Sequence, residues 1–249
     1  MLKLAQSKDL DAILTICDGD LLGTRIGCYA LAYGFDRDFL YIWLDEDNGT
    51  VVAKFYDSIT LKTDSDDVEE IADFIRMIGF ESLETNLETC RKLGYDNFET
   101  KKAYVFSGAS QDGEAVNLGE EYYKKLYNLV SENIPGSFSS DAESYFAFLS
   151  DFTFRKYRNL ARCKGIISEG NLVSSVITAA ETKTSALISA VACDKNIRGK
   201  GLGKKTVMSM VDELISENKK VFVIALNESA QGFYEHLGFE YYDDIAIIK

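Results

Sequence analysis

A glycine-rich loop between an apolar run and an amphipathic run is the feature that most limits the folds open to this chain. Residues 186–193 read ALISAVAC, a continuous apolar segment typical of a buried strand. Residues 198–205 read RGKGLGKK, and after them Val207, Val211 and Leu214 recur at helical spacing. This order predicts a strand, a glycine loop and a helix, an arrangement that presents unpaired backbone N–H groups to an anion.

The pattern continues on both sides of the loop. Downstream, we predict a β-branched strand (221–226), a helix over 229–238 that begins after Asn227 and stops at Gly238, and a closing strand (239–249). Upstream, we predict helices over 120–133 and 142–160, and a hairpin over 161–184 that turns at 169–171.

The end of the first half of the chain resembles the end of the second half. CRKLGYDNFETKKAYVF (90–106) echoes YEHLGFEYYDDIAIIK (234–249), and before it we expect a hairpin-like segment (39–63), a helix (66–79) and a strand (80–85). We therefore predict two related domains, residues 1–108 and 118–249, joined by the polar segment 107–117.

Two common phosphate loops do not fit the glycines. A Walker loop has four residues between its first glycine and the Gly-Lys pair, whereas only three separate Gly199 from Gly203. A dinucleotide fingerprint has G-x-G-x-x-G and an acidic residue after the next strand, whereas this chain has G-x-G-x-G and reaches Asn227.

A third pattern, [RQ]-x-x-G-x-[GA], is met by Arg198 to Gly203. With the strand before it and NESAQGFYEHLGF (227–239) after it, residues 118–249 resemble the GNAT superfamily of acetyl-CoA-dependent acyltransferases. The resemblance implies an α/β (α+β) fold, with a mixed, mostly antiparallel sheet flanked by helices, and here two tandem GNAT-like halves. It also implies an N-acetyltransferase, in which a primary amine attacks acetyl-CoA directly, without an acyl-enzyme.

The resemblance and the loop together assign the residues that contact acetyl-CoA. They are Val191, Cys193, Arg198, Gly199, Lys200, Gly201, Leu202, Gly203, Lys204 and Asn227. Gly201 and Gly203 let a pyrophosphate approach without a Cβ in the way. The lysines, including Lys205, either meet the remaining phosphate of CoA or are simply solvated, and Asn227 also fits a helix cap. Cys193 fits an inert, buried small residue.

Catalytic roles are less fully specified. Tyr234 matches the tyrosine that protonates the departing thiolate in the family, with core packing as the alternative. The general base stays open among Glu181, Asp194, Glu228 and a water relay. A backbone N–H near Val191 is the candidate for holding the oxyanion.

The acceptor is expected over the two helices that precede the hairpin. Aromatic residues of 142–160 either line its pocket or belong to the core, and Arg155 and Arg158 either bind an acidic acceptor or are solvated. The expected partner is a small-molecule or peptide amine, and the expected assembly is a monomer with pseudo-dimeric halves or a homodimer.

Composition excludes several other classes. The net charge of −13 argues against nucleic-acid binding, and no apolar run is long enough to span a membrane. The single histidine, His236, rules out a histidine-rich metal site, so we expect no metal. Five scattered cysteines without a CxxC pair, and no secretory signal, predict a cytoplasmic protein.

The first half departs from the family pattern at the loop. Its equivalent segment reads Asp64-Ser65-Asp66-Asp67, with no glycine and three carboxylates that would repel a pyrophosphate. We expect this half to bind no CoA. Two alternatives to an acetyltransferase remain: a non-catalytic acyl-CoA sensor or scaffold, and a transferase of a longer acyl group.

Overall fold

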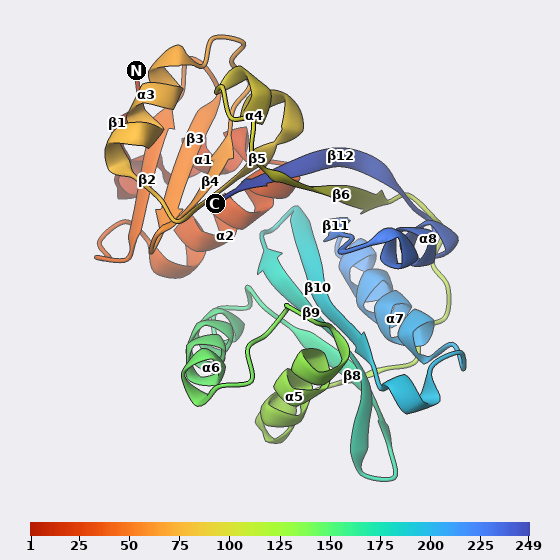
Figure 1. Cartoon of the computed structure of the whole chain (residues 1–249). Coiled ribbons are helices and arrows are strands. Elements are labelled where there is room, and N and C mark those ends of the chain that lie inside the picture. The colour runs from red at the N-terminus through yellow and green to blue at the C-terminus, as the bar shows by residue number, and fades with distance from the viewer. The chain divides into compact units, whose positions relative to one another are not determined.

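The computed structural model describes residues 1–249, and they form two compact units. The first unit contains Met1–Val105 together with Ile224–Lys249, and the second contains Phe106–Val223. One series of elements occurs twice along the chain (Figure 1): a strand, a 3-10 turn, two helices, three strands, a helix, a strand, a helix and a strand. The second copy has one further 3-10 turn, Lys195–Ile197, after its run of three strands. This repetition agrees with two tandem halves. The boundaries of these compact units differ from those of the predicted domains 1–108 and 118–249. The predicted domains describe the sequence repeat, and they stay a prediction.

The first series was predicted only in part. Its elements are β1 (Lys3–Leu4), α1 (Leu10–Ile16), α2 (Leu21–Tyr33), β2 (Leu40–Asp45), β3 (Thr50–Phe55), β4 (Ser58–Lys62), α3 (Glu69–Ile78), β5 (Ser82–Asn86), α4 (Leu87–Lys92) and β6 (Glu99–Phe106). The segment expected as a hairpin over 39–63 forms three strands, β2 to β4. Helices α1 and α2 were not expected from the sequence.

The second series follows the predicted order closely. Its elements are β7 (Val116–Asn117), α5 (Tyr123–Asn133), α6 (Ala142–Lys156), β8 (Cys163–Ser168), β9 (Asn171–Glu181), β10 (Ser185–Cys193), α7 (Leu202–Ser216), β11 (Lys220–Ile224), α8 (Glu228–His236) and β12 (Phe239–Ile248). The hairpin turns between Ser168 and Asn171, as predicted.

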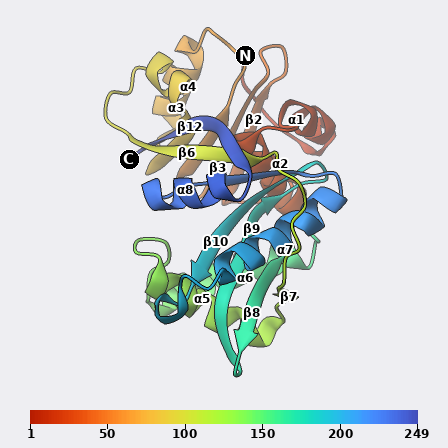
Figure 2. The ribbon, with the colours of Figure 1, turned by 90° about the vertical axis from the view of Figure 1, so that its right-hand side faces the viewer.

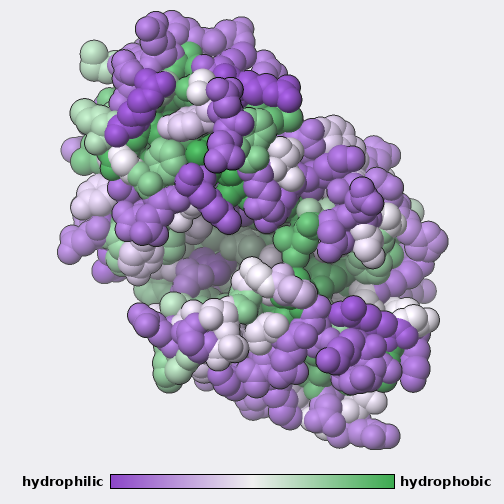
Figure 3. Space-filling view, in the orientation of Figure 1, coloured by the Kyte–Doolittle hydropathy of each residue, from purple (hydrophilic) through white to green (hydrophobic).

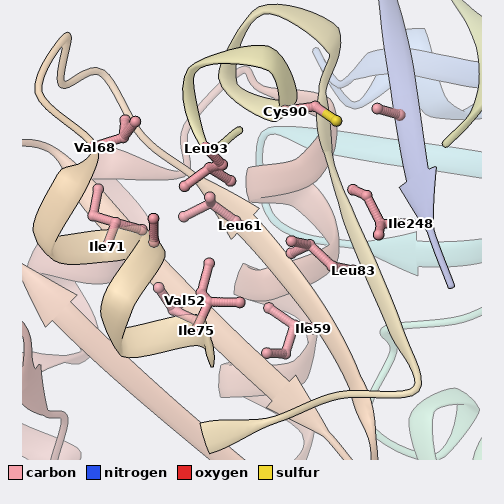
Figure 4. Packing of buried hydrophobic residues seen from close by; sticks show 12 residues of the cluster. Val52, Ile59, Leu61, Val68, Ile71, Ile75, Leu83, Cys90, Leu93 and Ile248 are labelled. Atoms are coloured by element: carbon pink, nitrogen blue, oxygen red, sulfur yellow. The ribbon is translucent and has the colours of Figure 1, made fainter. Parts of the chain in front are cut away.

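The first unit is a sheet with helices on both faces. The strand order is β1-β2-β3-β4-β5-β12-β6, in which β4 and β5 are parallel and β12 runs antiparallel to β5. Helices α3 and α4 cover one face through an apolar cluster in which their side chains meet those of the strands (Figure 4). Helices α1 and α2 pack against β2 and β3 through a second cluster.

The second unit has the same layered design. Its strand order is β11-β10-β9-β8-β7, with β10 and β11 parallel and the other pairs antiparallel. Helix α7 crosses one face of β8, β9 and β10, and α5 and α6 lie on the other face (Figure 2). The cluster under α5 and α6 includes Phe152, Ala190 and Ala192, so the end of β10 is packed against these helices. The sheet is mixed and mostly antiparallel, as predicted.

The surface is polar, in keeping with the charge of the chain. The face in Figure 3 is dominated by hydrophilic residues. No helix is both long and apolar enough to cross a membrane. All five cysteines are free thiols, and only Cys193 is not fully buried.

Candidate functional site

The end of β10 departs from regular strand geometry. Its pairing with β11 runs from Ser185↔Lys220 to Ile188↔Val223 and then stops. On the other side, the register with β9 shifts between Ser189 and Ala192, and Ala190 lies between them with a φ of 50°. A β-bulge with a non-glycine residue in the left-handed region is rare and strained. The end of β10 before the loop is therefore irregular and is not paired with β11.

The glycine loop follows directly, and its conformation explains two of its glycines. Gly199 and Gly201 have φ values of 81° and 74°, which other residues rarely adopt. A Cβ built on either glycine would meet no protein atom within 4 Å. The backbone conformation therefore requires glycine here, and the space beside the backbone is left open.

The helix that follows begins with unpaired donors. The first N–H with a partner in this helix is that of Lys205, which donates to the carbonyl oxygen of Gly201 at 3.0 Å. The N–H groups of Leu202, Gly203 and Lys204 precede it and have no helical acceptor. Together with the helix dipole, they form an electropositive cradle of the kind that binds phosphate.

Arg198 holds the loop in place. Its Nε donates to the carbonyl oxygen of Cys193 at 3.3 Å, and its guanidinium donates to the carbonyl oxygen of Asn133 at 3.1 Å. The side chain of Asn133 also accepts a hydrogen bond from the N–H of Lys195 at 2.9 Å. Arg198 thus joins the loop to the end of α5. No sequence pattern singles out Asn133, because its partners Lys195 and Arg198 lie far along the chain.

The lysines of the loop divide into two groups. Lys205 forms an ion pair with Glu114, with 2.6 Å between Nζ and Oε2. Lys200 and Lys204 are exposed, and no acidic side chain pairs with them. These two remain available for an anionic ligand. Burial raises the pKa of the Cys193 thiol, so it stays protonated at neutral pH and fits an inert residue.

Asn227 and Tyr234 lie on α8, which belongs to the first unit. Asn227 is the N-cap of α8, and its Oδ1 accepts the N–H of Ala230 at 3.0 Å. Asn86 caps α4 in the same way, accepting the N–H of Thr89 at 2.7 Å. The cap alternative for Asn227 is therefore correct, and it occurs in both series of elements.

Tyr234 is buried in the first unit. Its side chain is 6% exposed and its ring packs against Phe233 and Phe239. Burial is the cause that raises the pKa of Tyr234 above its ordinary value. The hydroxyl therefore keeps its proton at neutral pH and can donate it to a hydrogen bond.

The structure narrows the choice of general base. Glu181 is fully buried, pairs with Arg162, and accepts from Lys219 at 2.5 Å. It pairs in register with Ala186, five residues before Val191, which places it about 16 Å along the strand from the bulge. Its carboxylate is already held by two cations far from the bulge, so Glu181 does not lie at the candidate site.

The two other candidate bases differ from Glu181. Asp194 accepts from the backbone and the side chain of Asn196, at 2.9 and 3.0 Å. Glu228 is exposed in the first turn of α8. The choice among these two and a water relay stays open.

The helices expected near the acceptor are mostly occupied by their own contacts. Arg155 is buried, pairs with Asp151, and donates to the carbonyl oxygen of Ala179 at 2.8 Å. Arg158 stacks over the ring of Phe154 at 3.6 Å. Arg155 is thus occupied by its own contacts, whereas Arg158 is exposed and pairs with no acidic side chain, as the solvated alternative predicts. The aromatic rings of α5 and α6 stack on one another as a core, with Phe146 and Tyr157 as the exposed members.

The counterpart of the loop in the first unit has none of these features. Asp64 forms an ion pair with Lys62, and Asp66 pairs with Lys92 at 2.8 Å. The hydrogen bond from Lys92 lowers the pKa of Asp66, so this carboxylate is charged at neutral pH. Helix α3 starts at Glu69 without a glycine in the segment before it. Cys90 takes the place that Tyr234 holds in the other copy of the repeat.

The predicted residues thus form two groups. Val191, Cys193 and the loop from Arg198 to Lys204 share one end of β10 and the start of α7 in the second unit. Asn227 and Tyr234 share α8 in the first unit.

Comparisons with known proteins bear on the fold of the chain. Residues 164–247 match the family described as FR47-like protein. No curated protein matches the sequence. An acetyltransferase from the GNAT family of Colwellia psychrerythraea has a similar structure, with a TM-score of 0.62 and 11% identity, over 99% of this chain and 98% of that one.

Two further solved structures cover nearly the whole chain. A tandem GNAT protein from the clavulanic acid biosynthesis pathway has a TM-score of 0.61 and 10% identity, over 100% of this chain and 98% of that one. A GCN5-related N-acetyltransferase from Sphaerobacter thermophilus has a TM-score of 0.60 and 12% identity, over 99% and 94% of the two chains. At these identities the likeness establishes the fold: this chain has the GNAT fold, in a tandem arrangement.

Proposed function

We propose that this chain transfers an acetyl group from acetyl-CoA to a primary amine. The observation that carries the proposal is the loop at Gly199–Gly203, where two left-handed glycines open the space beside three unpaired N–H groups of α7. The FR47-like match to residues 164–247 and the GNAT fold support the same reading.

Each group of residues takes one part of the task. The N–H groups of Leu202, Gly203 and Lys204 bind the pyrophosphate, because hydrogen bonds to a charged acceptor contribute about 1.5–3 kcal/mol each. Lys200 and Lys204 bind the remaining phosphate of CoA. The backbone at Val191 and Cys193 binds the pantetheine arm and the thioester, which supplies the activated acyl group.

The reacting groups need a proton acceptor and a proton donor. An amine with a pKa of about 10.4 is almost fully protonated at neutral pH, so a base or a water relay must take its proton before attack. Asp194, Glu228 or a water fills that role. Tyr234 donates a hydrogen bond to the sulfur as its negative charge develops. The backbone N–H of Val191 holds the developing oxyanion.

The first test separates donor binding from turnover. Binding of acetyl-CoA is measured by calorimetry for the wild type, Gly201→Ala and Gly79→Ala, and thiol release is then followed with polyamines, amino acids, aminoglycosides and lysine peptides. Gly79 is the control, because it also has a positive φ, 61°, and an open Cβ position at the end of α3. Its ψ is 159°, against 5° for Gly201, so alanine is strained more at Gly79 than at Gly201.

The expected result is specific to the loop. Both substitutions strain a glycine with a positive φ: Gly201→Ala, at an αL position, costs about 1–2 kcal/mol of stability, and Gly79→Ala costs more. Only Gly201→Ala weakens acetyl-CoA binding, by about 10-fold or more, since it moves the N–H groups that hold the pyrophosphate. A wild-type chain that does not bind acetyl-CoA would overturn the proposal. Binding without thiol release on any amine would favour an acyl-CoA sensor or a longer acyl donor.

A further inference from the structure

Two consecutive serines on β9 face the bulge of β10, and neither is part of the predicted site. Ser174 and Ser175 are both fully buried. The hydroxyl of Ser174 donates to the carbonyl oxygen of Ala192 at 3.1 Å, and that of Ser175 donates to the carbonyl oxygen of Ala190 at 3.2 Å. Successive side chains of a strand point to opposite faces, so the two hydroxyls reach β10 from the two faces of the sheet. The carbonyls that they hold flank Val191.

This arrangement fixes the direction of two backbone donors. The carbonyl of Ala190 and the N–H of Val191 belong to one trans peptide group, so they point in opposite directions. Because Ser175 holds that carbonyl toward β9, the N–H of Val191 points away from β9. The same argument applies to the carbonyl of Ala192 and the N–H of Cys193. It agrees with the N–H of Asp194, which donates to Val173 on β9 at 3.0 Å, since neighbouring residues of a strand alternate sides.

Away from β9 lies the side where β10 has lost its strand partner. The pairs with β11 end at Ile188, so within the second unit no strand accepts the N–H groups of Val191 and Cys193. Ala190, with its φ of 50°, is the residue at which the strand turns out of register. A strained residue of this kind persists only where its surroundings hold it. The two serines are the polar contacts that hold the carbonyls beside it.

A third buried hydroxyl extends this contact to the phosphate loop. Thr206, in α7, is fully buried, and its Oγ1 lies 2.8 Å from Ser174 Oγ and 2.8 Å from the carbonyl oxygen of Leu202. Each hydroxyl has a single proton to donate. When Thr206 donates to Ser174, the proton of Ser174 goes to Ala192, and the chain of hydrogen bonds runs from Thr206, in the second turn of α7, to the bulge.

We propose that Ser175 and Ser174 are positioning residues for acyl transfer, which turn the N–H groups of Val191 and Cys193 toward the acyl donor. The proposal rests on the proposed function, because the acyl donor is the substrate assumed there. Neither hydroxyl touches the substrate. Ser175 controls the N–H that holds the oxyanion, and Ser174, through Thr206, connects the bulge to the phosphate loop.

The two serines therefore predict different kinetic effects. Ser175→Ala lowers kcat by about 10- to 100-fold, somewhat less than the loss of a whole oxyanion donor, because the N–H is misdirected and not removed. Its KM for acetyl-CoA stays within about twofold, since the phosphate loop is untouched. Ser174→Ala raises the KM for acetyl-CoA more than it lowers kcat, because it breaks the connection to α7.

The experiment pairs kinetics with crystal structures of the variants. Thr178→Val is the matched control: Thr178 is fully buried on the same strand, and its Oγ1 accepts the N–H of Arg162 at 2.8 Å, away from the bulge. Ser175→Cys keeps the side-chain volume with a weaker donor and is measured in case the alanine variant folds poorly. The expected structural result is that Ala190 leaves the left-handed region in Ser175→Ala and keeps it in Thr178→Val.

Each outcome decides the question. If Ala190 keeps its conformation in Ser175→Ala, and kcat falls no further than in Thr178→Val, the positioning role is wrong. If Ala190 relaxes while the wild type neither binds nor turns over acetyl-CoA, the proposed function fails, and the catalytic role of the serines fails with it. If Ala190 relaxes and kcat falls at unchanged KM, the proposal is supported.

Discussion

Tyr234 is better suited to donate a hydrogen bond to the departing thiolate than to transfer its proton to it. Burial raises its pKa above the ordinary value of about 10 for a phenol, whereas a thiol has a pKa of about 8.5. Full proton transfer from this phenol to a thiolate is therefore uphill by about 2 kcal/mol or more. The buried hydroxyl can still stabilise the developing charge on sulfur through a hydrogen bond. Release of the thiolate to solvent can complete the protonation.

The pH dependence of the reaction tests this role. Because the pKa of Tyr234 is raised, its hydroxyl stays protonated below about pH 10, and loss of activity through its ionisation begins only above that pH. Tyr234→Phe is expected to lower kcat by about 10- to 100-fold with little change in the KM for acetyl-CoA. Kinetic profiles of the wild type, Tyr234→Phe and the exposed control Tyr241→Phe check this. A basic limb near pH 8–9 that disappears only in Tyr234→Phe would contradict it.

For single residues, the sequence predicts a conformation best where the residue type itself favours that conformation. Gly201 was predicted to leave the backbone open and has a positive φ, whereas the second such position is Gly199 and not the predicted Gly203, which is the second residue of α7. Ala190 was not predictable, because nothing about alanine in an apolar run signals a left-handed conformation. The carbonyls of Ala190 and Ala192 accept from Ser175 and Ser174, which are near in space through strand pairing and read in sequence only as polar residues inside an apolar strand.

At the level of elements, α8 is fastened to the strand β6 of the first series. The hydroxyl of Tyr104 on β6 donates to Oε1 of Glu235 on α8 at 3.0 Å, and the N–H of Ala225 donates to the carbonyl oxygen of Lys102 at 2.9 Å. Tyr104 is 1% exposed, and burial and the contact with Glu235 raise its pKa to about 12. The element that carries Tyr234 is therefore held by the other copy of the repeat.

Removal of this contact should loosen α8. Tyr104→Phe is expected to cost about 1 kcal/mol of unfolding free energy, a modest value because Glu235 is exposed and regains water. Amide exchange in α8 should rise more than in α4. Urea unfolding and hydrogen exchange measure both effects. Tyr123→Phe is the control, because Tyr123 is equally buried and desolvation is the main cause that raises its pKa. Equal losses in the two variants would show that the contact does not anchor α8.

Elements with a clear pattern were predicted, and those without one were missed. The boundaries of α7, β10 and the β8–β9 hairpin follow the sequence to within a few residues. Helix α2 is buried on nearly all sides, so it has no amphipathic stripe to indicate a helix. It also carries Gly23, where a Cβ would lie 2.4 Å from the carbonyl oxygen of Cys17. That glycine is required by the close packing of α1 and α2, which the local pattern does not show.

At the scale of the whole molecule, the sequence predicts the repeat better than it predicts which strands pair. The pattern of residues 239–249 indicates a strand, but not that β12 pairs with β5 from Ile245↔Asn86 to Ile248↔Leu83. Period-two patterns define the faces of a strand and leave its neighbour open. For this reason the compact units differ from the limits of the repeat, although the order of elements was largely foreseen.

The two copies of the repeat should differ in donor binding, with one acetyl-CoA bound per chain. The first copy keeps an asparagine cap, Asn86, at the position that Asn227 has in the second copy, but it has Asp64-Ser65-Asp66-Asp67 in place of the glycine loop. Ion pairs already occupy the lysines nearest to this segment: Lys62 with Asp64, and Lys92 with Asp66 and Glu88.

Titration calorimetry with acetyl-CoA should therefore give a stoichiometry near one. Addition of a pyrophosphate to the first copy would place it against these carboxylates and break their ion pairs, and no unpaired glycine-loop donors would compensate. Gly201→Ala should weaken the single site without exposing a second one. A stoichiometry of two in the wild type, or binding that survives unchanged in Gly201→Ala, would show that the acidic segment also accepts the donor. The two copies would then differ in how they bind the amine acceptor and not in how they bind acetyl-CoA.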